Sequence, residues 1–151
     1  MLAEALPDMG EERDEVVAME VERTIWEKAT ILHAEYHRPA TQAVGERFSR
    51  HYSDSAALWK QPAGAASLAR LDLLEHVALF KSRFFGPSWA NYAEAKPEGL
   101  RLVPPSHRKS ELAQDYAKMG PMFLALPRTF EEVVETLREA EARINDPPSE
   151  G

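Results

Sequence analysis

The sequence contains three groups of residues whose types and spacing could perform chemistry, and the first is a histidine pair. His33 and His37 stand four residues apart in the stretch HAEYH, which places both imidazoles on one face of a helix. Such a pair can bind a metal ion, but the zinc-protease pattern needs a glutamate directly after the first histidine, and here the glutamate is Glu35. No pattern indicates a third ligand. We therefore interpret the pair as structural residues packed beside Trp26, and we expect no metal site in this chain.

The second group combines a lysine with a basic and an acidic residue further along the chain. Lys28 lies on the edge of an apolar stripe, where its stem can cover hydrophobic surface while its amine reaches water. Arg50 and Asp54 are four residues apart, and a surface ion pair is the simplest interpretation of that spacing. Spacing alone therefore does not assign catalysis to these three residues.

The third group is the stretch KSRFF, in which Lys81 and Arg83 precede two phenylalanines near the end of a predicted helix. Basic and aromatic side chains together can hold the phosphates of RNA and stack on its bases. The alternative is a buried aromatic helix end whose basic residues face water. The sequence leaves both interpretations open, and Lys81 and Arg83 are candidate RNA contacts.

Composition limits the classes of protein to which the chain could belong. Its 151 residues form one domain or part of one, with 44% hydrophobic and 28% charged residues, as in ordinary globular proteins. The net charge of -7 argues against non-specific nucleic-acid binding through bulk charge. Because the chain has no cysteine, disulfides, thiolate zinc sites and cysteine nucleophiles are excluded.

The apolar runs and the N-terminus bear on localisation. The longest apolar runs are far shorter than the roughly 20 residues needed to span a bilayer. The N-terminal segment is acidic, whereas a secretory signal begins with basic residues. We therefore expect a cytoplasmic protein with no membrane partner.

Hydrophobic periodicity predicts a mainly α fold, a single helical domain over residues 16–145 with at most one or two short strands. Residues 1–15 and 146–151 are predicted to be loose, because their acidic residues, prolines and glycines do not support a packed helix. The stretch VVAMEV, residues 16–21, is the candidate strand. The first helix should begin at Thr24, where Thr-x-x-Glu forms a capping box, and end near Arg38, before a proline.

Later segments predict further helices separated by prolines and glycines. The expected ranges are about 47–59, 67–85, a short turn at 88–95, 106–119 and 129–144. The stretch QPAG is expected to break the chain, and the proline-rich loop 96–105 allows at most a brief edge strand. A second Thr-x-x-Glu pattern at Thr129 predicts the start of the last helix. The helix over 67–85 should bury Leu68, Leu71, Leu74 and Ala78.

Several of these stretches, taken in order, resemble one family. The stretch ERTIWEKATILHAEYHRP, residues 22–39, is similar to the signature E-R-T-F-W-E-K-A-T-x-L-H of AbiEii/AbiGii-type nucleotidyltransferase toxins. The stretch RFSRHYSDSAAL resembles their segment R-x-S-R-H-Y-Y-D-L, with departures at Ser53 and Ser55. The later stretches HVALFKSRFFGPSWANYAEAKPEGLRLVPPSHR and TFEEVVETLREAEARIN are similar to the helical C-terminal half of that family. The resemblance covers about residues 16–145.

The resemblance implies a polymerase-beta-like nucleotidyltransferase, the toxin of a toxin–antitoxin or abortive-infection pair, which moves a nucleotide from an NTP to a target such as tRNA. By match of motif, Lys28 is the phosphate-facing lysine and a catalytic residue. Asp54 is the second catalytic residue, as a base or as support for the metal site, and Arg50 orients it or contacts phosphate. The full-length family is expected to use Mg²⁺ and an NTP and to have a cognate antitoxin.

The sequence departs from the family at the metal site. A polymerase-beta-like site needs a Gly-Gly or Gly-Ser turn followed by Asp-x-Asp, and the chain contains neither. We therefore expect a C-terminal portion of such a toxin, inactive and without bound cofactor until it joins an N-terminal catalytic lobe or split partner. The face left by that lobe should expose apolar residues. The alternative is a non-catalytic helical binding module, or a truncated remnant, that binds antitoxin or RNA.

Overall fold

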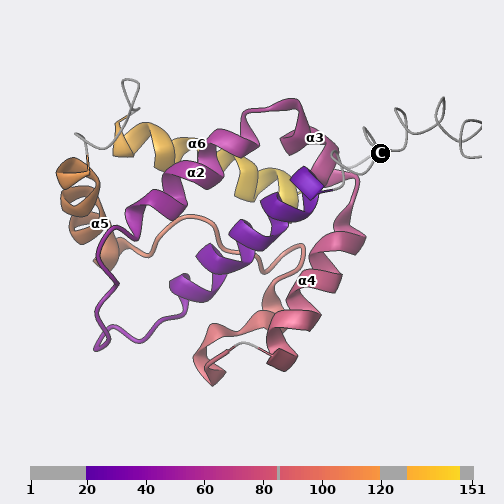
Figure 1. The fold of residues 1–151 in the computed structure, drawn as a ribbon, viewed down its shortest axis with the longest axis horizontal. Helices are drawn as coiled ribbons and strands as arrows, with labels where there is room; N and C mark the ends of the chain where they lie inside the picture. The colour runs from indigo at the N-terminus through magenta and orange to yellow at the C-terminus, as the bar shows by residue number, and fades with distance from the viewer. Residues whose placement is uncertain (1–19, 85, 120–128, 147–151) are drawn as a thin grey trace, which may run out of the picture.

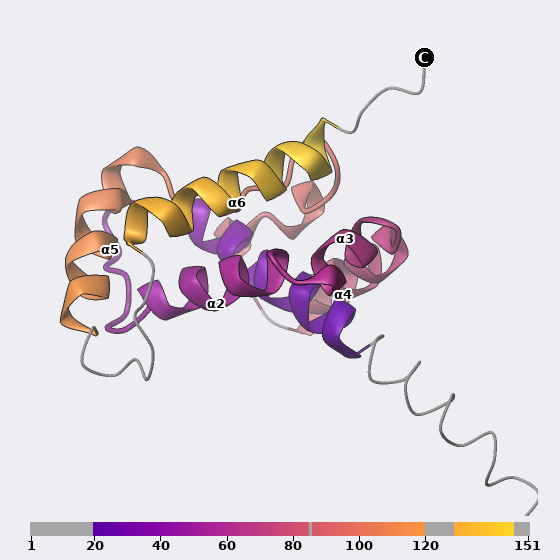
Figure 2. The same cartoon turned by 90° about the horizontal axis from the view of Figure 1, so that it is seen from above.

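The computed structural model describes residues 20–84, 86–119 and 129–146. Over these ranges the protein is helical, with irregular connections and no strand, so the predicted mainly α fold is confirmed. Figure 1 shows a helix through the middle of the molecule, with α2 and α6 above it and α4 to its right. Seen from above in Figure 2, α6 runs alongside α2, and α5 lies at one end of that pair.

The helix in the middle of the molecule covers residues 20–36 and is here called the central helix. It is helical from the first described residue and ends just before Pro39, which disfavours helical backbone in the residue that precedes it. The helical spacing of Ile25, Ala29, Leu32 and Tyr36 predicts one apolar stripe; the first three residues are no more than 1% exposed, whereas Tyr36 is only partly buried. Trp26 and His33 are also fully buried, so the buried face is wider than the predicted stripe.

Two predictions about the start of the central helix are wrong. Thr24 lies inside the helix, and its hydroxyl donates to the carbonyl oxygen of Glu20 at 2.8 Å instead of capping a helix start. The candidate strand over residues 16–21 is helical at residues 20 and 21, and its other residues lie outside the described ranges. A Thr-x-x-Glu pattern caps a helix only where the backbone before it is not helical, and here that backbone is helical.

The chain after the central helix forms α2 over Ser49–Trp59, as predicted, and then a short helix that was not expected. This helix, α3, spans Pro62–Leu68, with Pro62 in its first turn, where the missing N–H of proline costs nothing. The prediction that QPAG only breaks the chain is therefore wrong.

The helix predicted over residues 67–85 is divided in two. Its first residues belong to α3, and α4 spans Leu71–Phe84 after a break at Ala69 and Arg70; residue 85 lies outside the described ranges. Leu74 and Ala78 are buried as predicted, but Leu68 is only partly buried and Leu71 is 39% exposed. The break rotates α4 relative to α3. Apolar residues spaced as in one continuous helix therefore no longer share one buried face.

The remaining elements agree with the sequence. Two 3-10 turns, η1 over Ser88–Ala90 and η2 over Tyr92–Glu94, precede α5 over Ser106–Lys118 and α6 over Phe130–Asn145. The second capping pattern is correct, because the Thr129 hydroxyl accepts the backbone N–H of Glu132 at 3.1 Å. The apolar residues that recur at helical spacing in α6 are all buried, as that spacing predicts, namely Phe130, Val133, Val134, Leu137 and Ile144.

The irregular segment between η2 and α5 contains no strand and crosses the core, with Leu100 and Leu102 both 0% exposed. Side chains of α6 satisfy its backbone. Glu141 accepts the N–H of Leu102 at 2.7 Å, and the side-chain amide of Asn145 donates to the carbonyl oxygen of Leu100 at 2.7 Å. Buried backbone needs such partners, and a helix provides here what a neighbouring strand provides in a sheet.

The large hydrophobic residues that are exposed in the described ranges all belong to α4: Leu71, Leu79, Phe80 and Phe84. The two phenylalanine rings contact one another, with centroids 4.9 Å apart. The exposed apolar face that the sequence predicts therefore has a candidate location on this helix.

The junction of α2 and α3 yields a stability prediction. A Cβ atom on Gly64 would lie 2.4 Å from the carbonyl oxygen of Trp59, a backbone atom that can move only if the end of α2 moves. We expect Gly64→Ala to lower the free energy of unfolding by about 1–3 kcal/mol, measured by urea denaturation. Gly45→Ala is the matched control, because a Cβ atom there meets nothing within 4 Å. Equal stability of the two variants would contradict this contact.

Candidate functional site

The residues predicted to form the site lie where the central helix meets α2. Trp26 of the central helix packs edge-on against Trp59 of α2, with ring centroids 5.4 Å apart and ring planes at 77°. The two residues are only 0% and 5% exposed. This buried contact fixes the distance between the central helix and α2. It thereby also sets the distance between the polar side chains that the two helices carry at the nearby surface.

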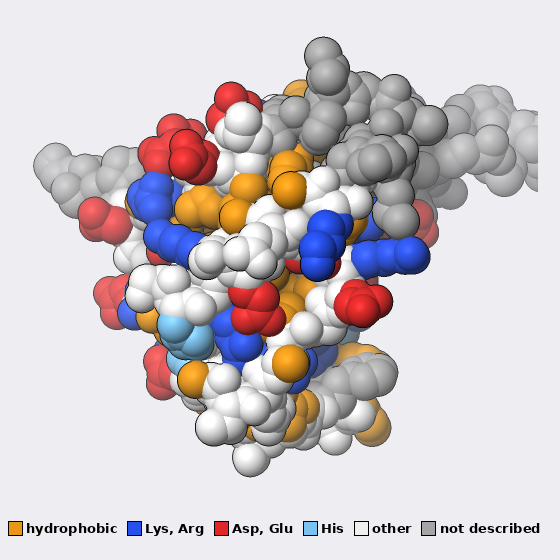
Figure 3. All heavy atoms as spheres, turned by 90° about the vertical axis from the view of Figure 1, so that its left-hand side faces the viewer, with side chains coloured by type: hydrophobic (Ala, Val, Ile, Leu, Met, Phe, Trp, Pro, Cys, Tyr) orange, Lys and Arg blue, Asp and Glu red, His pale blue; other side chains and the backbone are white. Residues whose placement is uncertain are grey.

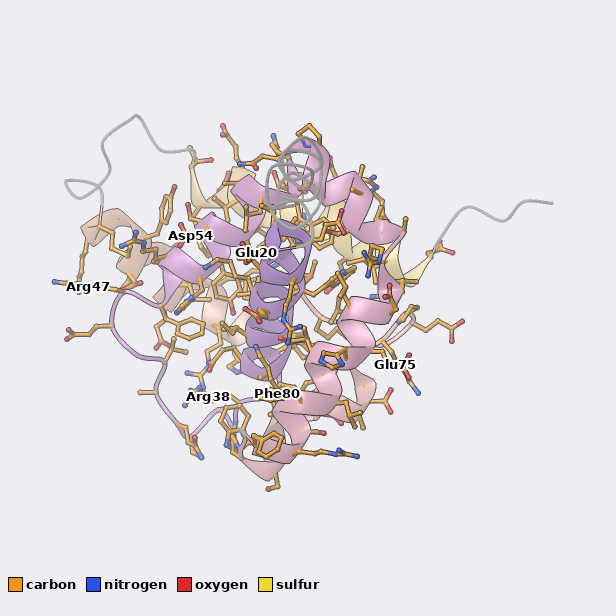
Figure 4. All side chains as sticks on the ribbon, turned by 45° about the vertical axis from the view of Figure 1, so that its right-hand side comes forward. Glu20, Arg38, Arg47, Asp54, Glu75 and Phe80 are labelled. Carbon is orange, nitrogen blue, oxygen red and sulfur yellow. The ribbon has the colours of Figure 1, made fainter. Side chains whose placement is uncertain are left out.

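Lys28, Arg50 and Asp54 come together at this surface. The Nζ atom of Lys28 lies 3.8 Å from Oδ2 of Asp54, and Nε of Arg50 lies 3.6 Å from the same oxygen. Figure 4 shows Asp54 on α2 beside the central helix. The side chains of Lys28 and Asp54 are 25% and 40% exposed, and that of Arg50 is 69% exposed, so water weakens both pairs. Two cations thus share one carboxylate in an open, net positive cluster.

His51 borders this cluster, although the spacing argument did not select it. Burial lowers the pKa of His51, and the charges of Lys28 and Asp54 shift that pKa in opposite directions. Its Nδ1 atom is buried and has no hydrogen-bond partner among the described residues. The imidazole is therefore neutral near pH 7 and leaves the charge of the cluster to the other three side chains. Its position three residues before Asp54 was the available signal.

The placement of α2 depends on a carboxylate from another helix. The residue before α2, Phe48, offers no polar side chain as a cap. Asp115 of α5 instead accepts the backbone N–H groups of Arg47 and Ser49, at 2.8 and 3.0 Å, and also the Ser49 hydroxyl. Burial by itself raises the pKa of Asp115, but the hydrogen bonds from Ser49 and Arg47 lower it overall. Sequence patterns could not reveal this cap, because 66 positions separate Asp115 from Ser49.

His33 is a structural residue whose two ring nitrogens are both used. Nδ1 accepts the backbone N–H of Arg101 at 3.1 Å, so Nε2 carries the proton and donates to the carbonyl oxygen of Asn91 at 2.8 Å. Burial lowers the pKa of His33, which keeps the ring neutral. The ring of His37 lies 4.9 Å away in an edge contact. His33 therefore offers no nitrogen to a metal ion.

The candidate RNA contacts Lys81 and Arg83 lie on α4, across the central helix from α2. The Lys81 ammonium donates to the backbone carbonyl oxygen of Glu27 at 2.8 Å, and burial lowers its pKa to about 8. Arg83 is exposed.

On the face of the molecule that carries α5, acidic and basic side chains are interspersed, so this face does not form a basic surface (Figure 3).

The magnesium ion that the family resemblance implies does not fit the described residues. No three histidine, aspartate or glutamate side chains converge in these ranges. The Asp54 carboxylate already lies between two cations, whereas Mg²⁺ needs a set of oxygen ligands. The cluster is suited to bind an anion through Lys28 and Arg50, not a metal ion.

Comparison with known proteins gives one match. The family model described as "Nucleotidyl transferase AbiEii toxin, Type IV TA system" matches residues 3–136, which include the central helix and α2. Neither a curated protein nor a solved structure is significantly similar to the chain. Within the described ranges, no helix is long and apolar enough to cross a membrane.

The cap supplied by Asp115 yields a prediction about stability and pH. We expect Asp115→Ala to lower the free energy of unfolding by about 1–2 kcal/mol near pH 7, because the backbone N–H groups of Arg47 and Ser49, at the start of α2, lose their acceptor. The pKa of Asp115 is lower in the folded protein than in the unfolded chain. Its stabilisation is therefore complete above the unfolded pKa and is lost as the pH falls through the folded pKa.

Urea denaturation of the wild type and of Asp115→Ala, at pH 7 and at successively lower pH, measures this effect. The control is Glu139→Ala, which removes an exposed carboxylate of α6. A difference between wild type and Asp115→Ala that is the same at every pH would argue against the ionised cap.

Proposed function

The chain belongs to the nucleotidyl transferase AbiEii toxin family of type IV toxin–antitoxin systems, and we propose that it supplies the phosphate-binding side of the active site. Family membership implies a nucleotidyltransferase toxin with a cognate antitoxin. The observation that carries the more specific proposal is the meeting of Lys28, Arg50 and Asp54, which come from two motifs and two helices.

The cluster suits the chemistry of nucleotide transfer from an NTP. Negative charge spreads over the phosphate oxygens during transfer, and fixed cations nearby stabilise it. Lys28 is the proposed catalytic cation. Its ion pair with Asp54 is long, at 3.8 Å, and partly exposed. Exchange of this carboxylate for a phosphate oxygen therefore costs little, since such pairs contribute about 0–1 kcal/mol.

Arg50 and Asp54 have supporting roles in this proposal. The guanidinium of Arg50 is mostly exposed and can make two parallel hydrogen bonds to one phosphate. Asp54 holds Lys28 and Arg50 together before the nucleotide binds. Once a phosphate has replaced it beside Lys28, its carboxylate is free to accept a proton.

The remaining components of the reaction come from outside the described residues in this proposal. Mg²⁺ and an NTP are required by the complete enzyme, and an N-terminal catalytic lobe or split partner supplies the metal-binding carboxylates. A tRNA is the proposed acceptor, and the cytoplasm is the proposed location. Each of these statements rests on the family resemblance.

A second candidate function is a non-catalytic helical module that binds antitoxin or RNA. The observation in its favour is that no set of metal ligands converges in the described parts of the chain. This candidate predicts stoichiometric RNA or antitoxin binding by the purified chain without nucleotide transfer.

The test measures transfer of a labelled nucleotide from an NTP to total tRNA in the presence of Mg²⁺, with this chain joined to a catalytic lobe. We expect Lys28→Ala to reduce the rate by roughly 100-fold or more, because a cation that stabilises the transferring phosphate is lost. The pair with Asp54 is partly exposed, so we expect the variant to remain folded, with stability changed by no more than about 1 kcal/mol.

The matched control is Lys60→Ala, which removes an exposed lysine just after α2. Full activity of Lys28→Ala would refute the assignment. The chain by itself should label no RNA, and labelling by the rigorously purified chain would show that it contains a complete site.

A further inference from the structure

A groove of about 280 Å³ runs between the central helix and α4. Its walls are Arg23, Glu27 and Ile31 from the central helix and Val77, Phe80 and Lys81 from α4. In Figure 4, Asp54 lies above and to the left of the central helix, whereas Phe80 lies beside its lower end, toward α4. The groove and the phosphate-binding cluster thus occupy the two flanks of one helix, on which Glu27 and Lys28 are consecutive residues.

Of the two cations in this groove, Arg23 pairs with Glu27, whereas Lys81 forms no ion pair with a carboxylate in the described ranges and is affected by the charge of Glu27 only at longer range. The Lys81 ammonium is held by the backbone carbonyl oxygen of Glu27 at 2.8 Å. The carboxylate of Glu27 is engaged instead with Arg23, at 3.3 Å from its Nε atom. Burial lowers the pKa of Lys81 to about 8, which reflects the cost of a poorly solvated ammonium. Such a group gains from a ligand that brings a hydrogen-bond acceptor.

The groove also has an apolar wall that includes Phe80, whose side chain is 45% exposed. The ring of Phe84 lies outside the groove lining, 4.9 Å from that of Phe80 between centroids and tilted by 43° relative to it. Ile31 and Val77 contribute further apolar surface. Nucleic-acid bases stack on exposed aromatic rings of this kind in many binding sites.

We propose that this groove binds the base of the NTP whose phosphates contact Lys28. A base combines a planar ring that can stack on Phe80, acceptors that can face Lys81 and Arg23, and donors that can face Glu27. The volume suits a base alone, because sites for drug-sized ligands occupy roughly 300–1,000 Å³. The inference rests on the proposed function, since it names the second half of the ligand that the Lys28 cluster would hold.

The test compares ligands that have and lack a base, with the chain as it exists. The chain is titrated by calorimetry with ATP, CTP, GTP and UTP, and with inorganic tripolyphosphate, which has the phosphates but no base. EDTA is present throughout, so binding does not depend on a metal ion. We expect at least one NTP to bind more tightly than tripolyphosphate. Equal affinities for tripolyphosphate and all four NTPs would overturn the proposal.

Substitutions locate the base within the molecule. We expect Lys81→Met to weaken binding of the preferred NTP roughly tenfold and to leave tripolyphosphate binding unchanged, because one charged hydrogen bond is lost. Phe80→Leu should weaken NTP binding roughly fivefold or more through loss of stacking. Lys96→Met is the matched control, since this exposed lysine lines a different groove on α4, beside Tyr92. Circular dichroism confirms that each variant is folded.

Other outcomes separate this inference from the proposed function. If Lys81→Met weakens NTP and tripolyphosphate equally, Lys81 is a phosphate contact and the base assignment is wrong. A short single-stranded RNA is titrated in the same way; if Lys81→Met weakens only the binding of this RNA, the groove holds a base of the acceptor, and the proposal for the NTP is overturned. If Lys28→Ala changes the binding of neither the NTP nor tripolyphosphate, while Lys81→Met weakens NTP binding alone, the groove binds the base but the role proposed for Lys28 is wrong.

Discussion

The edge-on packing of Trp26 against Trp59 is the contact on which the site depends. Both rings are buried, and neither indole N–H has a hydrogen-bond partner in the described ranges. Each unpaired buried N–H costs about 1–3 kcal/mol, and the burial and packing of the two large rings offset that cost. Lys28 follows the first tryptophan by two residues, and Asp54 precedes the second by five. The separation of the helices therefore decides whether these two charges can meet.

In another part of the fold, polar side chains of helices supply the backbone hydrogen bonds that a neighbouring strand would supply in a sheet. The irregular segment after η2 is too buried to leave its backbone unpaired, and His33, Glu141 and Asn145 supply hydrogen bonds to it. In the same way, Asp115 of α5 supplies the cap that α2 lacks. Each bond joins residues far apart in sequence, so the connections and the helices stabilise one another.

Solvation distinguishes the two lysines on either flank of the central helix. Lys28 is partly exposed and shares a carboxylate with Arg50, whereas burial lowers the pKa of Lys81, which donates to a backbone carbonyl oxygen. A loosely paired, hydrated ammonium exchanges partners easily, which suits phosphates that bind and leave. An ammonium with poor solvation favours a fixed acceptor, which suits recognition of one chemical group. The same residue type thus serves different purposes because its surroundings differ.

Sequence alone determined the helical character of the chain, most helix ends and the buried face of α6, because helical periodicity and proline placement act over a few residues. It could not distinguish Thr129, which caps a helix, from Thr24, which lies inside one, because the two local patterns are the same and only the upstream backbone differs. It also could not locate the break before α4, which no glycine or proline marks. Only the tertiary structure joined Lys28 to Asp54 and bonded Lys81 to the backbone of the central helix, because those relations depend on how separate helices pack.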